Sequence, residues 1–114
     1  MSDADRGDAR RGGASLAEFR FETRIIYWRG PSPFFFAPIP PQYVEDVRRL
    51  AKVVTYGWGM APVEARIGDV DFNTSLYPKE GGYLLPLKAD VRRKVNITAG
   101  DLIAVDMAIQ PPSR

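Results

Sequence analysis

Apolar and polar side chains alternate along the chain from Phe19 towards Trp28. The charged residues Arg20, Glu22 and Arg24 separate the members of one face, which are Phe19, Phe21, Thr23, Ile25 and Tyr27. A period of two is that of a strand with one buried face, so the pattern predicts a first strand over residues 19–28. A glycine and two prolines within 30–33 then predict a turn. The run 34–37 is apolar at every position, which favours a core strand.

A helical period begins after a pair of prolines. Pro40 and Pro41 suit a first helical turn, where the missing N–H has no intrahelical partner to lose. Glu45 and Asp46 lie near this predicted start, where negative charge is favoured by the helix dipole. Glycines at 57 and 59 predict the end of the helix. Apolar residues recur between these limits at helical spacing, at Val44, Val47, Leu50, Ala51 and Val54.

The second half of the chain repeats this order of elements. Alternation predicts strands over 63–67 and 72–76, joined by a tight turn at Gly68 and Asp69. A further turn over 79–82 leads into an apolar strand over 83–87. A short helix over 88–95 follows, and a turn at Gly100 and Asp101 leads into a last strand over 103–109.

The tetrapeptide Asp-Val-Arg-Arg occurs in both predicted helices, at 46–49 and at 90–93. An apolar stretch that ends in a proline precedes each copy, with Pro38 before the first and Pro86 before the second. Such self-similarity indicates a duplicated unit that cannot bury its apolar face alone. Each half therefore predicts strand, strand, helix and strand. Closing the two halves on each other protects the strand edges within one small barrel.

Composition narrows the function classes. The 114 residues include 16 Lys and Arg and 14 Asp and Glu, which gives a net charge of +2. A protein that neutralises many phosphates carries a larger excess of basic residues. The chain has no cysteine and no histidine, which excludes disulfides, Cys/His metal sites and imidazole catalysis. We expect no metal and no cofactor. No apolar stretch is long enough for a membrane span or signal peptide, so the expected location is the cytoplasm.

The distribution of residue types also predicts domain limits. The aspartates and arginines near the N-terminus cancel in charge, and this segment has no aromatic side chain. Such a composition predicts a disordered N-terminal arm over 1–16. A single β-barrel domain is expected over 17–110, followed by a C-terminal tail over 111–114.

Two resemblances rest on particular segments. The stretch from Gly82 to Val105 combines an apolar strand with a proline, a short helix with arginines, Gly-Asp and a terminal strand, and it resembles the swapped-hairpin transcription factors and antitoxins of the AbrB and MazE type. Short elements across the chain carry a second likeness: Tyr27 to Pro31, Tyr56 to Gly59, Pro62-Val63, Thr74 to Leu76, Pro78-Lys79, Gly82 to Pro86 and Lys88-Ala89.

Together these elements resemble the bacterial family of domains of unknown function numbered nineteen-zero-five, over about residues 17–110. The resemblance implies a mainly β fold: a small double-split β-barrel built from two pseudo-repeats and capped by two short helices. It implies no established activity.

Aromatic residues at strand ends and turns are the first candidates for a binding site. Trp28, Tyr56, Trp58, Tyr77 and Tyr83 can line a pocket or stack on a planar ligand, although packing at the barrel ends is the more common use of such residues. We expect a tentative ligand site formed by Trp28, Tyr56, Trp58, Lys79, Tyr83 and Lys88.

Arginines in the two helices are the second candidates. Arg48, Arg49, Arg92 and Arg93 can form two basic patches that contact phosphates, while solvated helix ends are the commoner interpretation. A third possibility pairs Ser75 with Lys79 as nucleophile and base, but their spacing matches no catalytic signature.

The sequence therefore favours a non-catalytic binding or interaction module for an unknown small molecule or protein. A DNA-binding regulator or antitoxin-like protein is the first alternative, and an enzyme is the second. Specific nucleic-acid binding and membrane association are not expected, and both monomer and dimer stay open.

Overall fold

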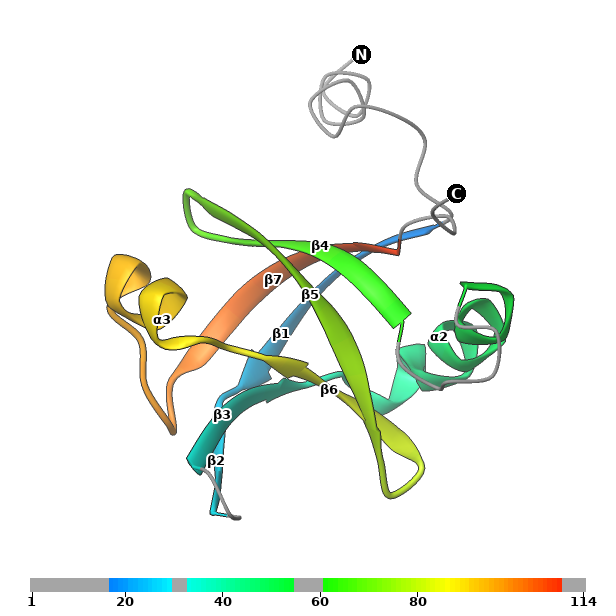
Figure 1. Ribbon diagram of the computed structural model, residues 1–114, viewed down its shortest axis with the longest axis horizontal. Helices are drawn as coiled ribbons and strands as arrows, with labels where there is room; N and C mark the ends of the chain where they lie inside the picture. Colours follow the sequence, from blue (N-terminus) through cyan, green and yellow to red (C-terminus); the bar gives the residue numbers. More distant parts are fainter. Residues whose placement is uncertain (1–16, 30–32, 55–60, 110–114) are drawn as a thin grey trace.

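The computed structural model describes residues 17–29, 33–54 and 61–109. These residues form seven antiparallel strands, in the order β1-β7-β4-β5-β6-β3-β2, and two helices beside the curled sheet (Figure 1). The elements are β1 (Ala17–Arg24), β2 (Ile26–Arg29), β3 (Pro33–Pro38), α2 (Pro41–Val54), β4 (Ala61–Ile67), β5 (Val70–Lys79), β6 (Gly82–Pro86), α3 (Ala89–Val95) and β7 (Leu102–Ile109). The predicted arm over 1–16 and tail over 111–114 lie outside the described residues.

Two strand segments pass from one half of the sheet to the other. β5 pairs with β4 through residues 70–76 and then with β6 through residues 77–79, and it crosses the full height of the curled sheet in Figure 1. β1 pairs with β7, whereas β2, which follows after Ile25, pairs with β3. We call β1, β7, β4 and residues 70–76 half-sheet A, and β2, β3, β6 and residues 77–79 half-sheet B.

The prediction of one strand over 19–28 needs a correction at Ile25. The Ile25 N–H donates to the Asp101 carbonyl at 2.9 Å, and the Gly100 N–H donates to the Ile25 carbonyl at 2.8 Å. These bonds to the segment before β7 separate β1 from β2. The Thr23 hydroxyl donates to the Pro38 carbonyl at 2.6 Å, which ties β1 to the end of β3.

The pairing of β3 with β6 relates the two halves of the chain. Around the central pair of Ala37 and Leu85, Phe36 pairs with Pro86 and Pro38 with Leu84. The Ile39 N–H donates to the Tyr83 carbonyl at 3.0 Å, and the Leu87 N–H donates to the Phe35 carbonyl at 2.9 Å. The two prolines that precede the helices therefore occupy matching places on either side of this pair.

The two helices carry the repeated tetrapeptide at different places. Asp90 lies in the first turn of α3, but no acidic residue lies in the first turn of α2. The helix starts at Pro41, as predicted, but Glu45 and Asp46 lie beyond its first turn, where the dipole has little effect, so the expectation that they favour the dipole is wrong. The copies nevertheless bury the same position, since Val47 and Val91 are both buried. At 14 residues, α2 is longer than the short helices that the family resemblance implied, but it lies within the limits predicted from Pro40 and Gly57.

The interior is filled by the inward-facing residues of both half-sheets and by α2. Val47 and Ala51 of α2 belong to the core, and Tyr43 packs edge-on against Phe19 with ring centroids 5.6 Å apart. Within the described ranges no helix is long and apolar enough to cross a membrane. The largest side chains with almost no exposed surface are Ile25, Leu76, Leu85, Met107, Ile109, Val47, Val63 and Val105.

Candidate functional site

The outer face of half-sheet B is covered by aromatic and aliphatic side chains. Trp28 lies opposite Phe34 and Ile26 opposite Phe36 in the β2–β3 pair. Because side chains opposite one another share a face, the register extends this face to Leu84 on β6 and to two residues of β5. We call the set the aromatic face; it consists of Ile26, Trp28, Phe34, Phe36, Tyr77, Lys79 and Leu84.

Phe36 is the centre of the aromatic face. Its ring centroid lies 6.1 Å from that of Trp28, 5.9 Å from that of Phe34 and 6.1 Å from that of Tyr77. Phe36 itself is 3% exposed, yet it does not belong to the interior core cluster. The neighbouring rings of the aromatic face therefore cover Phe36 on the outer surface of the sheet. Those rings remain accessible, with Trp28 36%, Phe34 47% and Tyr77 41% exposed.

Lys79 adds a positive charge to one side of this face. Its Nζ lies 4.3 Å from the centroid of the Trp28 ring, within the range of a cation–π interaction. The same ammonium lies 3.7 Å from the Glu80 carboxylate, whose side chain is 83% exposed. The lysine is therefore held against the indole while its charge stays near solvent.

A groove opens beside the turn that joins β5 to β6. Glu80 and Gly81 form this turn with φ values of 52° and 80°, as in the type I′ turns that suit the twist of a hairpin. The groove has a volume of about 230 Å³, and Arg48, Pro78, Lys79, Glu80, Gly81, Gly82 and Tyr83 line it. A neighbouring hollow of about 350 Å³ continues along α2 past Ile39, Pro41, Val44 and Glu45.

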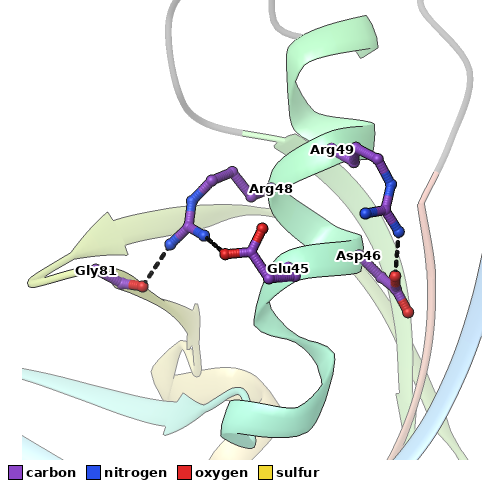
Figure 2. A network of polar contacts seen from close by, with 5 residues as sticks. All are labelled: Glu45, Asp46, Arg48, Arg49 and Gly81. Atoms are coloured by element: carbon purple, nitrogen blue, oxygen red, sulfur yellow. Dashed lines mark hydrogen bonds and ion pairs between the residues drawn. The ribbon is translucent and has the colours of Figure 1, made fainter.

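Arg48 connects α2 to this turn. Its guanidinium donates to the Gly81 carbonyl at 2.7 Å and also pairs with Glu45 on the preceding turn of the helix (Figure 2). Arg48 is therefore paired with Glu45, and Lys79 with Glu80, so each cation that lines the groove has a carboxylate partner. Arg49 pairs with Asp46 on another side of the helix (Figure 2).

A family model matches residues 21–107, which is most of the chain and nearly all of the described fold. The chain belongs to the family described as "Domain of unknown function (DUF1905)". A comparison with curated proteins found no match. The family was the one expected from the sequence, and its description gives no activity. The likeness to AbrB and MazE proteins gains no support from this match.

The structure of this DUF1905 domain brings together part of the predicted ligand site. Lys79 lies over Trp28, and Tyr83 lines the groove beside Lys79, although Tyr83 is only 7% exposed. Lys88 is exposed at the N-cap of α3, and no hydrogen bond, ion pair or ring contact joins its side chain to the other described residues of the predicted site. Tyr56 and Trp58 lie outside the described residues. The ligand-binding role of this set stays a prediction.

The four arginines of the nucleic-acid alternative do not converge. α2 and α3 lie on opposite sides of the curled sheet in Figure 1, which separates Arg48 and Arg49 from Arg92 and Arg93. Arg92 is also engaged: its Nε donates to the Leu87 carbonyl at 3.1 Å, and its guanidinium lies 3.8 Å from the centroid of the Phe35 ring. This alternative was likewise not tested by the family match.

The proposed nucleophile and base also occupy different surroundings. Ser75 pairs with Pro62 in half-sheet A, whereas Lys79 pairs with Gly82 in half-sheet B. In the described part of the chain, no three potential His, Cys, Asp or Glu ligands come together as a metal site would require.

Sequence reasoning missed four residues of the aromatic face, Ile26, Phe34, Phe36 and Leu84. The run of phenylalanines was expected to form a core strand, but Phe34 is 47% exposed. A usable signal was present, because consecutive side chains of a strand point to opposite faces. Three consecutive phenylalanines cannot all enter one interior, so at least one must face outwards.

Proposed function

We propose that this DUF1905 domain is a non-catalytic binding module and that the aromatic face is its binding surface. The observation that carries the proposal is the exposure of three rings, Trp28, Phe34 and Tyr77, around a buried fourth ring, Phe36. Rings that rest on a buried ring are held in place, so little conformational entropy is lost when a ligand covers them.

The size of the exposed surface supports this choice. An aromatic side chain carries about 150–250 Å² of surface, so the three rings and Ile26 leave roughly 300 Å² of mostly apolar surface in water. Continuous apolar patches of about 300–600 Å² are the largest on typical monomers and are often functional. The groove beside the β5–β6 turn is a weaker candidate, because its charges are largely paired with one another.

Titration with small planar aromatic compounds tests this function. We expect the compounds to shift the NMR resonances of Trp28, Phe34 and Tyr77 and to leave those of Tyr27 unchanged. Tyr27 is a matched control because it is 43% exposed and lies on β2, but its side chain faces the opposite side from Trp28. Shifts that centre on the groove residues Arg48 and Gly81, with the aromatic face unaffected, would move the binding surface to the groove.

We further propose that the curled sheet closes as a double-split barrel of two pseudo-repeats. The pairings support this: β1 with β7 matches β5 with β4, and β2 with β3 matches the end of β5 with β6. If the barrel is closed, the amides of Ile25, Ile39 and Leu87 exchange with solvent as slowly as those of the central strands. Fast exchange of Ile25 and Gly100, with slow exchange elsewhere, contradicts closure.

A further inference from the structure

We infer that the aromatic face binds single-stranded nucleic acid without strong sequence preference, an inference that rests on the function proposed above. Bases stack on exposed aromatic rings in many single-strand binding proteins, and every base offers a planar face for such stacking. An antiparallel sheet of four strands with aromatic residues on adjoining strands can hold two or three bases at once. Half-sheet B has this form, with exposed rings on β2, β3 and β5.

The charge of the face is complementary to a phosphate backbone. None of its outward positions in the described strands holds a carboxylate, and Lys79 supplies a cation beside Trp28. Arg29 follows Trp28 on β2, so its side chain points to the same side as Tyr27, away from the aromatic face. Lys79 also lies 3.7 Å from the Glu80 carboxylate, whose side chain is 83% exposed, so a bound phosphate would take the place of this solvated partner.

The size of the face argues against a second copy of the chain as the occupant. A stable protein interface buries about 800 Å² on each partner, whereas the exposed rings and Ile26 offer roughly 300 Å². An area of this size fits a few stacked bases. Duplex DNA fits this face less well, because its bases are already stacked on one another.

A direct test uses the full-length chain and a fluorescently labelled oligothymidylate of about twelve nucleotides, within the site sizes of single-strand binding folds. We expect saturable binding by anisotropy at low salt. Phe34→Leu and Tyr77→Leu should each weaken it about tenfold or more, because leucine keeps an apolar side chain but removes the ring on which a base stacks. Tyr27→Leu, on the opposite side of β2, should change the affinity less than about twofold.

The salt dependence gives a second readout. If Lys79 is the cation of this face that contacts a phosphate, the slope of log affinity against log salt should be about −0.7, the value for one contact on a single strand. Competing duplex of the same length should displace the single strand poorly. A slope of about −4 or steeper, with both leucine variants unaffected, would show that phosphate contacts elsewhere dominate and would overturn the inference.

The remaining outcomes separate this inference from the proposed function. If planar compounds bind the aromatic face but the oligonucleotide does not, the nucleic-acid inference is wrong and the binding module stands. If neither binds, both are wrong. If sedimentation shows a dimer that Phe34→Asp dissociates, the occupant is a second copy of the chain and the inference is again overturned.

Discussion

The outer faces of the two half-sheets share strand β5 and the segment that carries β1 and β2, but they present opposite kinds of residue. On half-sheet A, a row of alternating charges crosses four strands through Arg20, Asp106, Arg66 and Asp71. The Arg20 Nε lies 2.6 Å from Asp106, and Arg66 lies 3.0 Å from Asp71. Half-sheet B carries aromatic rings at the corresponding outward positions.

The comparison shows that the exposed rings are not required by the fold. A curled sheet with this connectivity tolerates arginine and aspartate on its outer face, since half-sheet A uses them on the same β1–β2 segment and on the same strand β5. The hydrogen bond with Asp106, and then its charge, raise the pKa of Arg20. The change to aromatic residues after Ile25 on one segment and after Leu76 on the other therefore calls for a separate explanation, and the binding function proposed above would supply one.

The strongest test of this contrast compares two phenylalanines on β3. Phe36→Ala should destabilise the domain by about 3–5 kcal/mol, because it removes a ring that is 3% exposed and leaves a cavity. Phe34→Ala removes a ring that is 47% exposed and should cost less than about 1 kcal/mol. Urea unfolding of both variants measures the difference. Equal losses would mean that the aromatic face acts as a second core.

The link between the two half-sheets should have the next largest effect. Thr23→Val keeps the shape of the side chain but leaves the Pro38 carbonyl without its hydroxyl donor, at a cost of about 1–3 kcal/mol. Thr74→Val on β5 is the control, since the Thr74 hydroxyl has no hydrogen-bond partner within the described chain. Unfolding midpoints that fall by the same amount for both variants would argue against a role for this hydrogen bond.

Loss of the cation beside Trp28 should have a smaller effect on stability. Lys79→Met keeps the length of the side chain and removes the ammonium, and we expect a loss of about 0.5–1 kcal/mol, typical of a cation–π pair at an exposed site. The emission of Trp28 should also change, which a Trp58→Phe background makes visible as the only tryptophan signal. An unchanged spectrum would show that the ammonium does not rest on the indole in solution.

The row of alternating charges on half-sheet A should contribute least to the stability of the domain. Asp71→Asn breaks the ion pair with Arg66, and because both side chains are partly solvated the loss should be below about 1 kcal/mol. The effect should shrink further as salt is raised, since salt screens exposed charges. A salt-independent loss above about 2 kcal/mol would contradict the view of this face as a solvated one.

The sequence predicted most of the element order, because each element has a clear period or turn. The break at Ile25 escaped prediction, since the inward alternation of Phe21, Thr23 and Ile25 continues through it. The break depends on bonds from Gly100 and to Asp101, which only the folded chain brings near. Periodicity along one strand cannot reveal a partner 75 residues away in the chain.

The candidate site could be predicted in part. Trp28 and Lys79 were placed in one group, and the structure holds the ammonium 4.3 Å from the indole. The place of Phe34 and Phe36 on the aromatic face could not be predicted, because an all-apolar run fits a fully buried strand as well as a strand with one exposed apolar face. Burial of one face by a helix or its exposure to solvent is decided by tertiary packing.

The pairing of β1 with β7 also determines when the domain can fold. β1 pairs along its whole length with the strand that is synthesised last in the described fold, from Ala17 with Ile109 to Arg24 with Leu102. Contacts of such long sequence separation are slow to form, because the closure of the intervening chain is unfavourable until they are made. During synthesis, β1 therefore stays unpaired until β7 has left the ribosome. Half-sheet A can form completely only when nearly the whole domain has emerged.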